Sequence, residues 1–157
     1  MHFDEIDLKI ASILGPNSRS SNREIARRLG INETTVRRRL SQMIESGILS
    51  VPAVIDIEKL PDKFMAIVGI RHQVPIPDDT FLQKVNELDS VIYSMTVTGH
   101  FDMFAIILAV SRKKLLEALR QIQSIEEVID TQTYVILENY GLDVQADKLL
   151  RLLENNK

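Results

Sequence analysis

Residues 21–40, which read SNREIARRLGINETTVRRRL, decide the fold of the amino-terminal end. Ser21 and Glu24 have the spacing of a capping box, in which a hydroxyl and a carboxylate satisfy free backbone N–H groups at a helix start. Gly30 suits the end of this helix because glycine takes a positive φ at little cost, and Asn32 can cap the next helix, which runs to about Ser46. Two short helices joined by a tight glycine turn predict a helix-turn-helix.

Apolar residues recur every three or four positions around this turn, which is the spacing of a buried helix face. Small Ala26 lets the two helices approach closely, and branched Val36 fills the angle between them. The predicted inward residues are Ile6, Ile10, Ile13 and Leu14 in a preceding helix that stops near Gly15, then Ile25, Ala26 and Leu29, and finally Val36, Leu40, Met43 and Ile44. We expect a three-helix unit.

Arginine is concentrated in the same stretch. The whole chain carries a net charge of −3, but residues 1–50 carry +2 and residues 19–39 contain seven arginines against two glutamates. Arginine presents a planar fork that suits phosphate groups and guanine edges. Such a cluster can also be an ordinary solvated helix face. Its position on a helix-turn-helix favours binding to double-stranded DNA.

Composition excludes several other classes of protein. The chain has 157 residues, 45% of them hydrophobic and 26% charged, and no cysteine, so disulfide frameworks, thiolate zinc sites and cysteine nucleophiles are excluded. Neither a phosphate-binding loop nor a metal-ligand spacing is present, and we predict no catalytic residue, metal or cofactor. The first fifteen residues are unlike a signal peptide, and the longest apolar run, Met103–Val110, is too short to span a membrane. We expect a cytoplasmic protein without a membrane partner.

The second half alternates short apolar strands with amphipathic helices in the order βαββαβ. The expected strands are Phe64–Val74, Val91–Thr98, Met103–Val110 and Val128–Leu137, the expected helices are Asp79–Leu88, Arg112–Gln123 and a final Gln145–Asn156, and Ile48–Ile57 is expected to form a strand or wing. This order predicts a ferredoxin-like domain with helices on one face of an antiparallel sheet. The fold class is therefore α+β. We expect a winged helix-turn-helix domain over residues 1–50, a linker strand over 51–62 and a ferredoxin-like domain over 63–157.

The other face of the sheet is also predicted to be apolar. The alternate positions that we assign to it are Met65, Ile67, Gly69, Met95, Val97, Ala105, Ile107, Val135 and Leu137. A large exposed apolar face is not tolerated in a monomer, so we expect a homodimer.

One loop, 98–102, suggests ligand binding. Gly99 exposes backbone donors that could hold a carboxylate, and the Asp102 carboxylate could accept hydrogen bonds from an ammonium group, so an amino acid zwitterion would find both complements. The candidate set comprises Thr98, Gly99, His100, Phe101 and Asp102 in this loop between the two central strands, with hydroxyls from Thr131 and Thr133 on the last strand. A glycine at this place can equally be a simple turn former.

The chain resembles the Lrp/AsnC family of transcription regulators over essentially its whole length. The stretches similar to that family are Asp4–Ile10, Asn22–Gly30, Thr34–Leu40 with Glu45–Leu49, and Val97–Asp102. The resemblance implies a dimeric DNA-binding regulator that can assemble into tetramers or octamers and binds a small amino acid between dimers. Position by position, it implies that DNA is contacted by Ser21, Asn22, Arg23, Thr34, Thr35, Arg37, Arg38 and Arg39. Of these, Arg39 is expected either to touch phosphate or to brace the fold.

Two alternatives remain open. Siroheme decarboxylases resemble this two-domain organisation, and bound tetrapyrrole would be seen by its absorbance. Those enzymes depend on histidine and arginine side chains around a large ligand, whereas the three histidines here are scattered and there is no tryptophan. The second alternative is an architectural DNA-binding protein without an effector, which would respond to none of the twenty amino acids.

Overall fold

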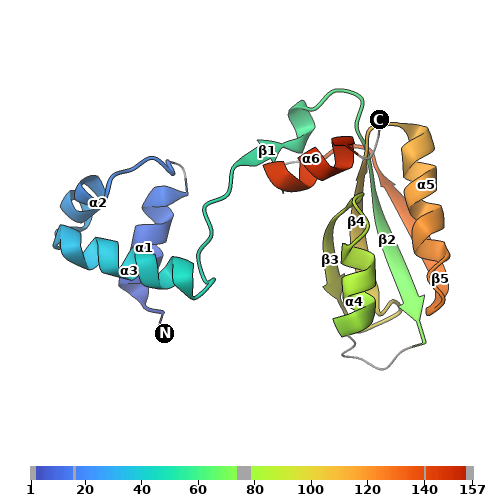
Figure 1. The fold of residues 1–157 in the computed structure, drawn as a ribbon, viewed down its shortest axis with the longest axis horizontal. Coiled ribbons are helices and arrows are strands. Elements are labelled where there is room, and N and C mark those ends of the chain that lie inside the picture. Colours follow the sequence, from blue (N-terminus) through green and yellow to red (C-terminus); the bar gives the residue numbers. More distant parts are fainter. Residues whose placement is uncertain (1–2, 16, 74–78, 140, 155–157) are drawn as a thin grey trace. The chain divides into compact units, whose positions relative to one another are not determined.

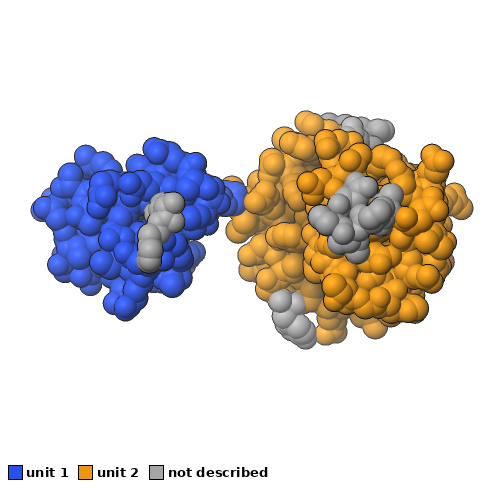
Figure 2. Space-filling model, turned by 90° about the horizontal axis from the view of Figure 1, so that it is seen from below, with its two compact units in different colours: residues 1–52 blue, residues 53–157 orange. Residues whose placement is uncertain are grey.

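The computed structural model describes residues 3–15, 17–73, 79–139 and 141–154. The chain divides into two compact units, residues 1–52 and residues 53–157 (Figure 2). Each unit has a hydrophobic core of its own. Within the described ranges, no helix is both long enough and apolar enough to cross a bilayer.

The first unit consists of three helices, α1 (Glu5–Leu14), α2 (Asn22–Leu29) and α3 (Glu33–Glu45) (Figure 1). Their buried core is formed by Ile10, Leu14, Ile25, Ala26, Val36 and Met43, so the predicted helical faces are largely confirmed. Ile44 is an exception, because 49% of its surface is exposed. Ile44 directly follows Met43, and successive side chains point about 100° apart around a helix, so Ile44 lies beside the buried stripe.

The turn between α2 and α3 has the predicted chemistry. Gly30 takes the left-handed conformation with φ of 65°, and its N–H donates to the carbonyl of Ala26. Asn32 caps α3 by accepting the N–H of Thr34 at 2.8 Å. The cap of α2 is simpler than predicted: the Ser21 hydroxyl accepts the N–H of Glu24 at 3.2 Å, while the Glu24 carboxylate pairs with Arg28. The turn therefore fixes the start of α3.

The second unit contains the expected βαββαβ order. The elements are β2 (Phe64–His72), α4 (Asp79–Asn86), β3 (Val91–Thr96), β4 (Met103–Ala109), α5 (Arg112–Gln123) and β5 (Val128–Ile136). The sheet is antiparallel with the strand order β3-β4-β2-β5, which confirms the ferredoxin-like arrangement. The loop 98–102 therefore joins an edge strand to a central strand, and the expectation that it joins two central strands was wrong. Val74, at the end of the first predicted strand, lies outside the described residues.

Four further elements lie around this sheet. They are β1 (Val54–Asp56), a 3-10 helix (Ile57–Lys59), β6 (Asp143–Gln145) and α6 (Ala146–Glu154). The strand predicted over Ile48–Ile57 is shortened to β1, and β1 pairs with β6 of the second unit. The predicted last helix extended to Asn156, which lies outside the described residues.

The two faces of the four-stranded sheet have different partners. On one face, Phe81 and Val85 of α4 and Leu115 and Ile122 of α5 pack against strand residues such as Ile70. On the other face, Leu149 and Leu152 of α6 cover one end of the sheet, where they pack against residues such as Met65 and Leu108. Helix α6 thus covers only part of the second face.

The prediction of which strand residues face away from α4 and α5 was partly wrong. Ala105 and Ile107 lie in the core under these helices, and Val135 shares that face because it is the register partner of Ala66. The alternation of side chains defines two faces for each strand, but it does not say which face packs on the helices when both faces are apolar, as they are here. The partly uncovered surface, which we call the open sheet face, is formed by Ile67, Tyr93, Met95, Phe104, Ile106 and Tyr134.

Candidate nucleic-acid interface and ligand loop

Helix α3 presents a polar face to solvent. Thr34, Arg37, Arg38 and Gln42 are exposed, and Thr35 is half-buried. These side chains lie opposite the apolar stripe that packs on α1 and α2. The helix therefore offers cationic and hydrogen-bonding groups along an exposed face.

The arginines of this face differ in their partners. Arg37 pairs with Glu33 at 3.0 Å one turn earlier, and 63% of its side chain is exposed. Exposed pairs at this spacing contribute little free energy, so an anionic partner could take over the guanidinium at small cost. Within the described part of the chain, Arg38 forms no ion pair. The hydroxyl of Thr34 donates to Oδ1 of Asn32, the residue that caps α3, at 2.5 Å.

The start of α2 offers a second contact area in the same unit. Ser21 and Arg23 are exposed and Asn22 is half-buried. Ser21, Arg23 and Arg27, together with Glu24, line a hollow of about 450 Å³. Free N–H groups and the positive end of the helix dipole favour anions at such a terminus. This area therefore suits a small anionic group.

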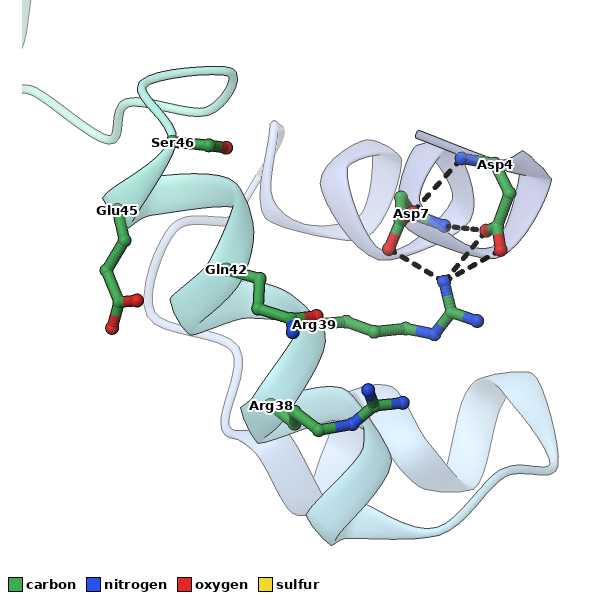
Figure 3. A pocket seen from close by; sticks show the side chains of 7 residues that line it. All are labelled: Asp4, Asp7, Arg38, Arg39, Gln42, Glu45 and Ser46. Atoms are coloured by element: carbon green, nitrogen blue, oxygen red, sulfur yellow. Dashed lines mark hydrogen bonds and ion pairs between the residues drawn. The ribbon is translucent and has the colours of Figure 1, made fainter. Parts of the chain in front are cut away.

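Arg39 differs from Arg37 and Arg38 in its ion-pair partners. Its guanidinium reaches Asp4 and Asp7 at the start of α1 (Figure 3). The N–H of Asp7, and then the Arg39 guanidinium, hold the pKa of Asp4 below its ordinary value of 3.8, while Asp7 and Asp4 raise the pKa of Arg39. Asp4 therefore stabilises the folded unit above its ordinary pKa, and this contribution is lost as the pH falls through the lowered value.

The loop between β3 and β4 is a tight turn with an exposed tip. Thr98, Gly99 and His100 are exposed, and Gly99 has a φ of 143°, a conformation that residues with side chains rarely adopt. The loop is closed at its base, where the N–H of Val97 donates to the carbonyl of Asp102 at 2.9 Å.

Phe101 is buried rather than presented at this tip. Its ring covers Gly69 of β2, where an added Cβ would lie only 2.7 Å from a ring carbon. The ring also meets Phe104 edge-on, with 5.3 Å between centroids. Gly69 is therefore needed at the centre of β2 because only a residue without a side chain leaves room for Phe101.

Asp102 connects the loop to β2. Its Oδ2 accepts the backbone N–H of His72 at 3.0 Å, and its own N–H donates to the carbonyl of Ile70 at 3.0 Å. The carboxylate thus already has one structural partner. Its other oxygen and its charge would be the groups available for a ligand.

Thr131 and Thr133 lie apart from this loop. Their register partners on β2 are Ile70 and Val68, which belong to the core under α4 and α5. Thr131 accepts a hydrogen bond from Gln123 of α5 at 3.0 Å. Within one chain, the structure therefore brings Phe101 and Asp102 onto β2 but does not gather the two threonines with them.

Two groups of functional interest were missed at the sequence level. Asp4 and Asp7 cap α1 and bind Arg39, and Asp-x-x-Asp directly before an apolar helical stripe could have indicated the cap. Gly69 and His72 support the loop from β2, and no local pattern indicates this role.

Two known protein domains match separate parts of the chain. Residues 3–50 match the winged helix-turn-helix DNA-binding domain, and residues 65–144 match the Lrp/AsnC ligand-binding domain. The two matches fall in the two structural units.

Curated relatives and solved structures agree with these matches. The HTH-type transcriptional regulator Ptr1 of Methanocaldococcus jannaschii is 34% identical over 143 residues, which cover 90% of this chain and 89% of the relative. The structure of Escherichia coli AsnC is 27% identical, with a TM-score of 0.75 and coverage of 90% of this chain and 97% of AsnC. A Neisseria meningitidis transcriptional regulator, solved as a complex with L-Met, has the same fold at 22% identity, with a TM-score of 0.73 and coverage of 90% and 94%.

Proposed function

Because the chain belongs to the Lrp/AsnC family of DNA-binding transcription regulators, we propose that α3 reads an operator in the DNA major groove and that a small amino acid modulates this binding. The relatives named above are called regulators, and we propose a regulatory role without catalysis. The observation that carries the proposal is the exposed, arginine-rich face of α3 on a helix-turn-helix with a buried core.

The residues proposed to meet DNA fall into two groups. Thr34, Thr35, Arg37 and Arg38, near the start of α3, would face base edges, since residues at the start of a recognition helix are the ones that enter the groove. Ser21, Asn22 and Arg23 at the start of α2 would hold the phosphate backbone. Phosphate contacts make affinity depend on salt, and each good bidentate base contact adds about 1–3 kcal/mol of discrimination.

The experiment that tests this function is selection of bound duplexes from a random-sequence pool, with and without a mixture of the twenty amino acids. We expect enrichment of a pseudo-palindromic sequence, which the mixture strengthens or weakens. Enrichment without any effect of the mixture would favour an architectural DNA-binding protein. Failure to enrich any sequence, combined with tetrapyrrole absorbance of the purified protein, would favour an enzyme similar to the siroheme decarboxylases.

A homodimer formed through the open sheet face would set the spacing between two recognition helices. Tyr93, Met95 and Tyr134 on this face are each 43–47% exposed, and α6 covers only one end of it. Two such faces packed together would bury apolar surface that is costly to leave in water. A twofold dimer places its recognition helices in successive major grooves, about 34 Å apart. Larger assemblies, tetramers or octamers, would then form from dimers.

Tyr134→Glu is expected to weaken dimerisation by at least about tenfold, because the twofold axis places two unpaired carboxylates in one apolar interface. Leu116→Glu is the matched control, since Leu116 is also 47% exposed but lies on α5, away from the open sheet face. Sedimentation velocity over a concentration series measures both. Equal dimerisation of the two variants would contradict this interface.

The loop 98–102 is the proposed effector site, completed by contacts between dimers. Exposed backbone N–H groups around Gly99 would hold a carboxylate, and the free charge of Asp102 would hold an ammonium group. Thr98, His100 and Phe101 would shape the site. Thr131 and Thr133 would join it only from another chain, because within one chain they lie on the α5 side of the sheet. The L-Met complex of the Neisseria regulator supports an amino acid as the ligand class.

Asp102→Asn is expected to remove the thermal stabilisation that the effector gives, while leaving the fold intact. The amide oxygen can still accept the N–H of His72, but the charge that would pair with an ammonium group is gone. A ligand at 100 times its Kd stabilises a protein by about 2.7 kcal/mol, which thermal unfolding resolves easily. The control is Asp130→Asn on β5, an exposed position. A shift retained in Asp102→Asn would place the ligand elsewhere.

A further inference from the structure

Of the three arginines at positions 37–39 of α3, Arg39 is the one that the described residues show bonded to carboxylates at the start of α1. Its Nη1 donates to both oxygens of Asp4, at 2.9 and 2.8 Å, and to Oδ1 of Asp7 at 3.0 Å. Only 20% of the Arg39 side chain is exposed. Figure 3 shows the guanidinium held between the two carboxylates, with Arg38 lying apart from them.

The two carboxylates are fixed by the backbone of α1. Oδ1 of Asp4 accepts the N–H groups of Ile6 and Asp7 at 2.9 and 3.1 Å, and Oδ2 of Asp7 accepts the N–H of Asp4 at 3.0 Å. The Asp7 side chain is fully buried. The acceptors for Arg39 are therefore part of the helix cap and cannot move without disrupting the start of α1.

Anchoring Arg39 sets the rotation of α3 about its axis. Successive residues of a helix point about 100° apart, so the direction of Arg39 determines where Arg37 and Arg38 point. The apolar contacts of Val36 and Met43 also restrict this rotation, but apolar packing is not directional. Charge-assisted hydrogen bonds are directional, so they restrict the rotation of α3 further than apolar packing does.

We propose that Arg39 is a positioning residue for DNA recognition, and that its attachment to Asp4 and Asp7 aims Arg37 and Arg38 at the bases. This inference rests on the proposed DNA-binding function. Arg39 would not itself contact phosphate. Asp4 and Asp7, although negatively charged, would therefore promote specific binding to DNA.

Simple electrostatics makes the opposite prediction, which allows a decisive test. If the carboxylates acted only by their charge, their neutralisation would strengthen binding to the phosphate backbone. If they act by holding Arg39, neutralisation lets α3 rotate about its axis, so that Arg37 and Arg38 are less well oriented. Binding to the selected duplex is then weakened. Asp7→Asn and Asp4→Asn remove one charge each and nearly preserve side-chain shape.

The experiment measures binding of the full chain to the selected duplex and to a scrambled duplex, by fluorescence anisotropy at several salt concentrations. For Asp7→Asn we expect at least a tenfold loss in the ratio of the two affinities, with unchanged or tighter binding to the scrambled duplex. Glu45→Gln is the matched control, because Glu45 lines one hollow with Asp4, Asp7 and Arg39 (Figure 3) but forms no bond with Arg39. We expect that control to keep the wild-type ratio.

Arg39 variants give an independent readout. A positioning role predicts that Arg39→Gln lowers the affinity ratio but leaves the slope of log affinity against log salt unchanged, and that Arg39→Lys restores part of the ratio. A phosphate contact predicts a slope smaller by about one unit. Circular dichroism checks folding, and if Asp7→Asn is unfolded, the more exposed Asp4→Asn decides the outcome.

Wild-type or tighter binding of folded Asp7→Asn and Asp4→Asn to the selected duplex would overturn the inference. A slope reduced by about one unit in Arg39→Gln would overturn it as well. If instead the wild-type chain and Glu45→Gln both fail to distinguish the selected from the scrambled duplex, the proposed DNA-reading function fails, whatever the role of Arg39.

Discussion

Replacing Arg37 and Arg38 together by alanine is expected to weaken binding to the selected duplex by roughly 30-fold or more. Two lost bidentate contacts account for this, since each is worth about 1–3 kcal/mol. Both side chains are exposed and neither belongs to the core of the helical unit, so the free energy of unfolding should be almost unchanged. Fluorescence anisotropy at several salt concentrations measures the affinity, and circular dichroism monitors the fold.

The control for this variant removes two positive charges from the other unit. Arg112 and Lys113 at the start of α5 are both exposed, and their replacement by alanine changes the net charge of the chain by the same amount. A general electrostatic effect would weaken binding equally in both double variants. If affinity is unchanged in the Arg37 and Arg38 variant at every salt concentration, α3 is not the recognition helix.

Phe81→Ala is expected to destabilise the second unit by about 3–5 kcal/mol, the usual cost of removing a buried phenylalanine. Phe81 is 2% exposed, and its ring lies 4.3 Å from the ring of His72, centroid to centroid. The cavity would open beside the residue whose N–H holds Asp102. Loss of packing at Phe81 should therefore also loosen the proposed effector loop.

Tyrosine fluorescence during urea unfolding measures this effect selectively, because the three tyrosines of the sequence (Tyr93, Tyr134 and Tyr140) all come after residue 52, where the first unit ends. The control is Leu116→Ala, since Leu116 is 47% exposed and exposed substitutions usually change stability by less than about 0.5 kcal/mol. Both variants are compared at one protein concentration, because dimerisation adds to apparent stability. Equal urea midpoints for the two variants would contradict the assignment of Phe81 to the core of the second unit.

Local patterns were sufficient to predict the three helices of the first unit and the βαββαβ order of the second, but not β6 or the 3-10 helix. Gly30 and Asn32 fix the turn before α3 through bonds to residues within a few positions, and the 3.6-residue repeat identifies the helix faces. The order of strands and helices likewise follows from changes along the chain in the spacing of apolar residues. This order predicted the ferredoxin-like sheet. These features depend on short-range chemistry, which a single sequence displays directly.

The remaining features depend on contacts between distant residues. Arg39 bonds to carboxylates 32 and 35 positions away, and Asp102 bonds to the N–H of His72 30 positions away. The family resemblance left open whether Arg39 touches phosphate or braces the fold, and nothing in the local sequence names Asp4 and Asp7 as its partners. The face on which Ala105 and Val135 lie was unpredictable for a related reason, since both faces of this sheet are apolar.

We propose that α3 of each subunit of a dimer reads the major groove. Methylation interference on the selected duplex tests it most directly, because the modified guanine N7 lies in the major groove and the modified adenine N3 lies in the minor groove. We predict two clusters of interfering guanines whose centres lie about one helical turn apart. Interference confined to adenine N3, or binding that no methylation disturbs, would contradict the account.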